Sequence, residues 1–464
     1  MIDPMTGKSR GLLAALVLLL VAAAGVLFFS YRYQAALARE NSGSFTVATT
    51  GDLRALLDSS DAQSQLITVA VRKLESSYYK PVAPDLPVTG EKIALTQFLA
   101  AKHIANVSLQ GNDPNAVLAY ANAHYAAKLG LDGPTQLTET ALRGIMGSVK
   151  DPYTVYLSPK EIQGLQESLD GGNFGGIGVY IYQLKDGAVV VQPIEGLPAA
   201  RAGMKPGEVI DTVNERRIAG MTLDAVEGLI RGESGSSVSI ASHEYNTKGP
   251  EHHYAIVREI IHVPTVSAKM EDGFDYIRLS DFGSTSAAEI KKALLDGRAK
   301  HAKGYILDLR NDGGGLLDAA VKISSYFIPH GAIVATISRD GERDEQDALG
   351  DAIDGLQPLV ILVNKYTASA SEITAGALQD YHLAKLIGTK TFGKGVVQSI
   401  YPMPDLGALK ITTARYVTPL GRDIQHKGIM PDIQVDQPVD PSLIDTKADK
   451  QLAAAKAQLR SQIR

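Results

Sequence analysis

The stretch from residue 358 to residue 398 constrains the fold most, because it contains a strand, a loop, a helix and a second strand in direct succession. Residues 359–363 form a short apolar run, which predicts a strand buried on both faces. The pattern turns helical over residues 370–381, and residues 384–388 predict the next strand. Such alternation is typical of an α/β core, in which helices cover the sheet.

Ser369 lies where this strand-loop-helix unit changes direction. The first N–H groups of a helix are unpaired and the helix dipole is positive there, so a developing negative charge would be stabilised. The N–H of Ala370 is a candidate oxyanion donor. Ser369 and Glu372 also match the capping-box pattern S-x-x-E, and most serines in that pattern only cap a helix. The stretch alone therefore leaves a nucleophile and a helix cap as alternatives.

Lys394, in the sequence FGKG, supplies the second half of a candidate site. A lysine flanked by glycines is ordinarily a solvated turn residue, but a serine nucleophile needs a base. His382 is poorly placed, because it lies at the far end of the predicted helix, roughly 20 Å from Ser369 at about 1.5 Å per residue. Burial can leave a lysine amine neutral near neutral pH. Gln398, four residues further on, could then hold the Lys394 amine in line with the serine.

The segments TASASEITAGALQDY and TFGKGVVQ resemble the carboxy-terminal processing, or tail-specific, serine proteases. The resemblance implies that Ser369 is the nucleophile, that Lys394 is the general base and that Gln398 orients the lysine. It also implies an α/β protease core with crotonase- and ClpP-like strand-helix repeats, here over residues 263–435.

A glycine run, DLRNDGGG, separates a predicted strand at residues 304–309 from a predicted helix at residues 316–327. Such a run exposes backbone N–H groups to whatever lies above it. It is similar to the D-L-R-N-x-x-G-G pattern of the same family, which implies that Gly314 or Gly315 forms the oxyanion hole with Ala370. Asp312 stands at a variable position and is expected to add a charge nearby. A phosphate-binding loop is rejected, because no lysine-serine pair follows.

Residues 171–262 alternate short strands with one helix, at residues 223–230, and resemble a bacterial PDZ domain. The resemblance implies that a peptide pairs with the strand around residues 179–182. The terminal carboxylate of the peptide would be captured by N–H groups of a glycine-rich loop, namely Gly175, Gly176, Ile177 and Gly178. Loop glycines more often serve a turn alone.

Residues 11–31 are expected to form a transmembrane signal-anchor, because the run is apolar and long enough to cross a bilayer of roughly 30 Å. Lys8 and Arg10 precede it, which predicts a cytoplasmic N-terminus over residues 1–10 and a catalytic part outside the cytoplasm, in the periplasm or beyond the cell. A cleaved signal peptide is the alternative, with the Ala-Leu-Ala of residues 36–38 as its cleavage site.

Residues 32–170 are expected to form a linker and a helical region. One helix has an apolar stripe, formed by Ile67, Ala70, Val71, Leu74 and Tyr78. Residues 86–136 look like an insertion, with a helix from Pro114 to about Leu129, and a further helix is predicted over residues 138–147. The sequence DPYTVYL at residues 151–157 is similar to the segment before the binding module in the family, and we interpret it as a turn with two packing tyrosines.

Composition excludes several classes of function. A net charge of −5 and a pI near 6.1 give no reason to expect nucleic acid. The absence of cysteine excludes disulfides and a thiolate nucleophile. The ten histidines show no HExxH or similar spacing, so we expect no metal site, and no cofactor.

We therefore expect a membrane-anchored serine endopeptidase that recognises the C-terminal end of protein substrates through its PDZ domain. A membrane-tethered PDZ scaffold with an inactive protease core is the alternative, and a crotonase-type acyl thioester enzyme is a weaker one. The tail, residues 436–464, is expected to be a largely solvated helix from residue 446 onward and a candidate contact with a second copy of the chain. An adaptor or activator protein is a further candidate partner.

Overall fold

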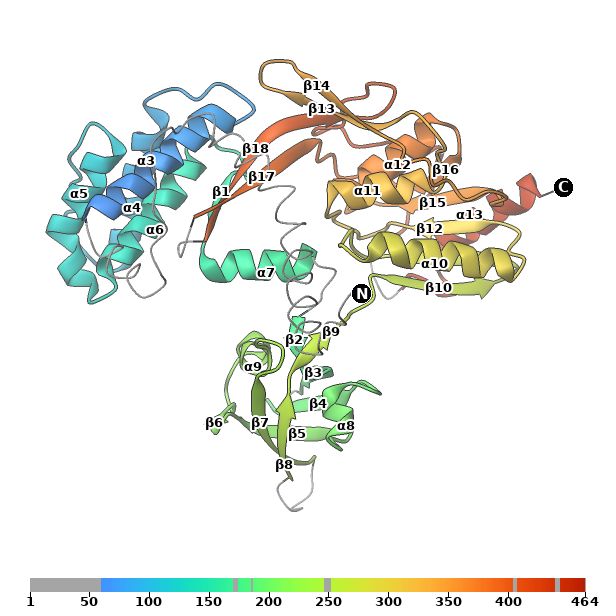
Figure 1. The fold of residues 1–464 in the computed structure, drawn as a ribbon, viewed down its shortest axis with the longest axis horizontal. Helices are drawn as coiled ribbons and strands as arrows, with labels where there is room; N and C mark the ends of the chain where they lie inside the picture. The colour runs from blue at the N-terminus through green and yellow to red at the C-terminus, as the bar shows by residue number, and fades with distance from the viewer. Residues whose placement is uncertain are drawn as a thin grey trace, which may run out of the picture. The chain divides into compact units, whose positions relative to one another are not determined.

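The computed structural model describes residues 60–169, 174–184, 187–245, 252–403, 407–438 and 443–463 (Figure 1). The predicted cytoplasmic N-terminus and transmembrane segment, residues 1–10 and 11–31, lie outside the described residues. Within the described part of the chain, none of the helices combines the length and the apolar character that crossing a membrane requires.

The first described elements form a helical region. It contains α3 (Ser60–Ser77), α4 (Leu86–Ala101), α5 (Pro114–Tyr125), the 3-10 turn η1 (Ala126–Leu129) and α6 (Gly133–Gly147). The predicted apolar stripe of α3 is largely buried. No separate helix is predicted from the sequence over the range of α4, and two glycines allow the close packing of this helix on α6. A Cβ added to Gly90 would lie 2.3 Å from the Gly144 carbonyl oxygen, so only glycine fits.

A six-stranded sheet forms the centre of the protease core, in the order β10-β11-β12-β15-β16-β19. Its strands are β10 (Val266–Glu271), β11 (Phe274–Leu279), β12 (Tyr305–Asp308), β15 (Leu359–Val363), β16 (Ala384–Gly388) and β19 (Ile433–Gln434). The five from β11 onward are mutually parallel and β10 is antiparallel. This is the arrangement that alternating strands and helices produce.

Helices cover both faces of this sheet. Alternate strand residues point to opposite faces, so Leu307 and Ile361 pack with residues of α10 (Ser286–Ala299), α11 (Leu317–Ser325) and α12 (Ala370–Asp380). Their neighbours Ile306 and Val360 pack instead with Leu452, Ala455 and Leu459 of α13 (Lys450–Gln462). The structure here differs from the expected solvated tail, because one face of α13 completes the core.

A second sheet brings distant parts of the chain together on one long strand, β18 (Ala408–Val417). β18 pairs antiparallel with β1 (Val155–Leu157), β13 (Ala332–Ser338) and β17 (Val396–Pro402), and β14 (Arg343–Asp347) pairs with β13. The end of the helical region therefore lies on the same strand as the segment that follows Lys394.

The module between these regions has its own sheet, in the order β3-β4-β5-β7-β8. Its elements include β3 (Val179–Gln183), β4 (Val189–Pro193), β5 (Glu208–Val213), β7 (Ser237–Glu244), β8 (His252–Val257) and the predicted helix α9 (Leu223–Ile230). β5 also pairs with β6 (Arg216–Arg217), while β2 (Phe174–Gly176) pairs with β9 (Glu259–Ile261). Helix α7 (Pro159–Leu169) precedes the module in the chain, and the one-turn helix α8 (Pro198–Arg201) lies between β4 and β5 in sequence. β3 lies at an edge of its sheet.

A buried ion network fixes α13 to the sheet. Arg310, 1% exposed, donates through Nε and Nη2 to Asp308 at 2.9 and 2.6 Å and through Nη1 and Nη2 to Asp449 at 2.9 and 2.8 Å. Asp449 is also the N-cap of α13, accepting the Leu452 N–H. The guanidinium therefore joins the end of β12 to the start of the last helix.

Replacing Arg310 with alanine should leave two buried carboxylates without their cation. We expect a loss of about 3–5 kcal/mol in the free energy of unfolding, measured by urea denaturation. Arg460→Ala is the matched control, because this guanidinium is 59% exposed and its ion pair with Asp272 should contribute at most about 1 kcal/mol. Equal losses in the two variants would contradict the role given to Arg310.

Candidate active site

Ser369 occupies a strained turn between β15 and α12. Its φ of 57° and ψ of −117° lie in a region that residues other than glycine rarely adopt, and the helix begins at the next residue. Such a turn holds a side chain at the mouth of a strand-helix unit instead of letting it follow the helix surface. Ser369 is half-buried there.

Glu372 joins the serine turn to the lysine loop. Its Oε2 accepts the Ser369 N–H at 3.0 Å and the Lys394 N–H at 2.9 Å. Its Oε1 accepts the Gly393 N–H at 2.8 Å and the Thr391 hydroxyl. The side chain is fully buried, and burial raises the pKa of its carboxyl although these four donors oppose the shift. One carboxyl group thus holds both predicted catalytic residues by their backbones; the S-x-x-E pattern had marked it only as a capping residue.

The Lys394 side chain is partly buried. Burial, and then the charge of Lys410, lower the pKa of Lys394 to about 8, while Asp151 and Glu372 oppose the shift. The Nζ atom lies 4.8 Å from the centre of the Tyr153 ring. The amine is therefore neutral in a useful fraction of molecules near neutral pH.

The glycines beside Lys394 serve close packing in addition to the turn. A Cβ on Gly393 would lie 2.7 Å from the Gly428 nitrogen, and one on Gly395 would lie 2.7 Å from the Gln425 nitrogen. Gly395 N–H donates to Gln425 Oε1 at 2.6 Å. The ordinary interpretation of a solvated glycine-rich turn therefore does not apply to this loop.

Gln398 lies on β17 opposite Thr412 of β18. Its Nε2 donates to Thr412 Oγ1 at 3.4 Å and to the Val396 carbonyl at 3.3 Å. In this structure the amide nitrogen is thus directed to β18 and to its own strand, and the orienting role of Gln398 toward the Lys394 amine stays a prediction.

The glycine run DLRNDGGG lies directly against the serine turn. A Cβ on Gly314 would be 2.8 Å from both Ser369 Cβ and Ala370 N, so the site has room only for glycine at this position. The Gly314 N–H donates to Asp312 Oδ1 at 2.8 Å and is engaged. Among the residues that the structure describes, the N–H groups of Gly315 and Ala370 donate to no other group, which favours these two of the three predicted oxyanion donors.

Asp312, which the sequence expects to add a charge near the site, is fully buried. Burial raises the pKa of its carboxyl well above the usual range, which disfavours the charged form. Its backbone carbonyl accepts the Ala368 N–H at 3.0 Å and the Ser371 hydroxyl at 3.1 Å. Asp312 thus fixes the glycine run to the serine turn.

The four predicted peptide-binding residues lie around the start of β3. Gly175 pairs with Ile260 of β9, and its carbonyl accepts the Gly232 N–H at 3.0 Å. Ile177 is 1% exposed, with its side chain in the core of the module. Gly178 has a φ of +72°, and a Cβ there would lie 2.4 Å from Leu197, so glycine is required. The loop leads into an edge strand, as recognition by strand addition needs.

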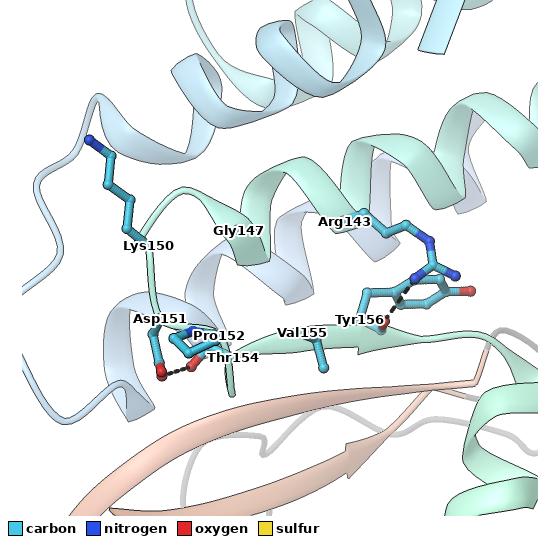
Figure 2. A pocket seen from close by; sticks show the side chains of 8 residues that line it. All are labelled: Arg143, Gly147, Lys150, Asp151, Pro152, Thr154, Val155 and Tyr156. Carbon is cyan, nitrogen blue, oxygen red and sulfur yellow. Dashed lines mark hydrogen bonds between the residues drawn. The ribbon is translucent and has the colours of Figure 1, made fainter. Parts of the chain in front are cut away.

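A hollow of about 450 Å³ lies where α6 ends and β1 begins (Figure 2). Its lining residues are Arg143, Gly147, Lys150, Asp151, Pro152, Thr154, Val155 and Tyr156. Ser369, Lys394 and Gln398 are not among them. The Asp151 carboxylate accepts the Thr154 hydroxyl at 2.7 Å, and Figure 2 marks this bond with a dashed line. No chemistry is assigned to this segment from its sequence.

Comparisons with known proteins identify the families to which two parts of the chain are similar. Residues 274–435 match peptidase family S41, and residues 189–242 match the PDZ domain family. A carboxy-terminal-processing protease of Bartonella bacilliformis is 39% identical over 310 residues, 66% of this chain and 70% of that protein. A probable CtpA-like serine protease of Staphylococcus aureus is 37% identical over 326 residues, 69% of this chain and 64% of that one.

Among solved structures, the photosystem II D1 C-terminal processing protease is similar at 28% identity and a TM-score of 0.45, covering 82% of this chain and 95% of that chain. A serine at a strained turn, joined through the Glu372 carboxyl group to a partly buried lysine, is an arrangement suited to a serine peptidase. The extent of the match to the Bartonella protein settles the family: this chain belongs to the carboxy-terminal processing serine proteases of peptidase family S41 and carries a PDZ domain.

Substituting Gly314 with alanine should abolish most peptidase activity. The added Cβ would fall 2.8 Å from Ser369 Cβ and Ala370 N, and the φ of +98° would be strained. The clash would displace the Ala370 N–H, so we expect a fall of about 100- to 1,000-fold in kcat, the range for loss of an oxyanion donor. Gly313→Ala is the control, since a Cβ at Gly313 meets nothing within 4 Å. Similar kcat values for the two variants would refute this geometry.

Proposed function

We propose that this protein is a membrane-anchored serine endopeptidase that cleaves protein substrates through a Ser369–Lys394 dyad after its PDZ domain has bound their C-terminal ends. The observation that carries the dyad is the buried Glu372 carboxyl group, whose Oε2 accepts N–H groups of both Ser369 and Lys394. Residues from two separate loops are thereby held within one hydrogen-bonded unit.

In the proposed reaction, neutral Lys394 takes the proton of the Ser369 hydroxyl as Oγ attacks the scissile carbonyl carbon. The carbonyl π electrons move to oxygen, and the N–H groups of Gly315 and Ala370 stabilise that oxyanion. Collapse of the intermediate breaks the C–N bond, and the Lys394 ammonium returns its proton to the leaving amine. Water then attacks the acyl carbon while Lys394 takes its proton, and collapse of the second intermediate breaks the C–Oγ bond as the Lys394 ammonium returns that proton to Ser369 Oγ.

Substrate capture is assigned to the module. β3 is an edge strand whose Tyr180 and Tyr182 side chains are 54% and 53% exposed, so an extended peptide can pair with its backbone. Residues 175–178, which span the end of β2 and the turn into β3, would receive the terminal carboxylate. The module would thus hold the C-terminal end of the substrate while the preceding part of the substrate chain reaches Ser369.

The apolar run at residues 11–31 supports a single-pass anchor in the cell membrane, and Lys8 and Arg10 before it support a catalytic part outside the cytoplasm. A tethered PDZ scaffold without turnover is the competing function. It would retain peptide binding and lose nothing when Ser369 is changed.

The decisive experiment measures cleavage of a reporter protein carrying an unstructured apolar C-terminal tail. Ser369→Ala and Lys394→Ala should each abolish cleavage, while far-UV circular dichroism and the unfolding midpoint stay near the parent values, since both side chains are only partly buried. A C-terminally amidated tail should raise KM more than it lowers kcat, because only capture needs the carboxylate. Persistent cleavage by Lys394→Ala would refute the dyad, and absence of cleavage by the parent chain would favour the scaffold.

The pH profile of kcat/KM should rise with pH. Lys394 acts as the neutral amine, and its pKa is lowered by burial to about 8, so the protonated, inactive form dominates below that value. We expect activity to increase about tenfold per unit at acidic pH and to level off above the midpoint. A profile that is flat from pH 6 to pH 9 would contradict a lysine base, and stopped assays with the tailed reporter at constant ionic strength can measure it.

A further inference from the structure

Residues 151–157 belong to neither family match, which cover residues 189–242 and 274–435. The sequence suggested that both tyrosines of this stretch pack. Tyr156 does so, at 1% exposure, but Tyr153 does not enter the core in the same way. Its ring lies with its centre 4.8 Å from the Lys394 Nζ atom.

We propose that this segment is part of the catalytic centre, with Tyr153 and Asp151 as positioning residues that set the protonation state and the direction of the Lys394 amine. The proposal rests on the proposed function of Lys394 as the general base. It assigns a catalytic purpose to the end of the helical region, which would otherwise be only a support for β18.

The segment is held in one register on β18. Asp151 Oδ2 accepts the hydroxyls of Thr154 at 2.7 Å and Thr412 at 2.5 Å, and Oδ1 accepts the Tyr153 N–H at 3.1 Å. The Thr412 N–H donates to Thr154 Oγ1 at 3.1 Å, and Val155 of β1 pairs with Lys410. A shift of one residue would turn every side chain to the other face, so these bonds determine where the Tyr153 ring points.

The same bonds reach the predicted orienting residue. Gln398 donates to Thr412 Oγ1 at 3.4 Å, and that hydroxyl donates to Asp151. Asp151 is therefore the end of a chain that fixes the Gln398 amide on β17. Loss of the Asp151 acceptor would free Thr412 and, with it, the amide that we expect to guide Lys394.

Tyr153 acts on the Lys394 amine in two opposed ways. Its bulk keeps water away, which disfavours the ammonium, while the negative face of its ring attracts it. The charged and titratable groups that face Lys394 from the packed elements are Lys410 and Tyr416 of β18, Glu372 of α12, and Asp151 and Tyr153 themselves. Burial of the amine has the largest effect and lowers the pKa of Lys394 to about 8, although the charges of Asp151 and Glu372 oppose it.

The test measures the titration of Lys394 directly in the full chain carrying Ser369→Ala. Trace acetic anhydride acylates neutral amines, and mass spectrometry of the Lys394 peptide across pH gives the midpoint without any need for turnover. Tyr153→Leu keeps the apolar bulk and removes the ring, so the midpoint should fall by about half a unit to one unit. Tyr153→Ala admits water, so the midpoint should rise by about one unit or more.

Asp151→Asn removes a charge that favours the ammonium and should also lower the midpoint. Tyr120→Leu is the control, because Tyr120 stacks on His124 in α5 and should leave the midpoint unchanged. Opposite shifts for the leucine and alanine variants support the proposal, since a role in stability alone would move neither. If Tyr153→Ala fails to fold by circular dichroism, lowered midpoints in Tyr153→Leu and Asp151→Asn decide in its favour.

Midpoints that match the parent value in Tyr153→Leu and Asp151→Asn would overturn the role of the segment. The labelling midpoints do not depend on peptide cleavage, whereas the proposed function is tested by cleavage of the tailed reporter with Ser369 intact. Without the Ser369→Ala change, Tyr153→Leu should shift the acidic limb of the kcat/KM profile by the same amount as the labelling midpoint. A lack of turnover in the parent chain would refute the protease and leave the labelling result unaffected.

Discussion

The site depends on one buried carboxyl group that accepts four donors. Glu372 lies in the first turn of α12, where the positive end of the helix favours it, and its two oxygens accept N–H groups from the serine turn and the lysine loop. A carboxyl group without these donors could not be buried at acceptable cost. Glu372 can therefore be buried only when its carboxyl group accepts these donors, so the serine turn and the lysine loop are held in place together.

The second requirement is a dry environment for an amine, and it is met by parts of the chain that lie far apart in sequence. β17 follows Lys394, β18 runs antiparallel to it, and β1 brings the end of the helical region onto the same strand. The pairing places Lys410 and the Tyr153 ring near the amine and keeps water away. A strand shared by three partners thus determines the acidity of a side chain, which no local segment could do.

Much of the core was predictable from local pattern. The apolar run at Leu359–Val363, the strand at Ala384–Gly388 and the helix at Leu223–Ile230 have the bounds that periodicity predicts, because each is set by nearby residues. The sequence did not reveal α4, the burial of α13 or the burial of Asp312. Each depends on neighbours in space: α4 packs on α6 where Gly90 meets Gly144, Leu452 of α13 packs on the central sheet, and the Asp312 carboxyl is enclosed by the protein, which raises its pKa.

The sequence by itself determined which groups are available, a serine at a strand-helix turn, a lysine between glycines and a glycine run after another strand, because these are properties of residue type and spacing. Only the tertiary structure decided their chemical state. It engaged the Gly314 N–H, turned Gln398 toward Thr412 and placed Tyr153 against Lys394. The reason is physical: acidity and donor availability follow from burial and from neighbours in space, and those are fixed only when the sheets assemble.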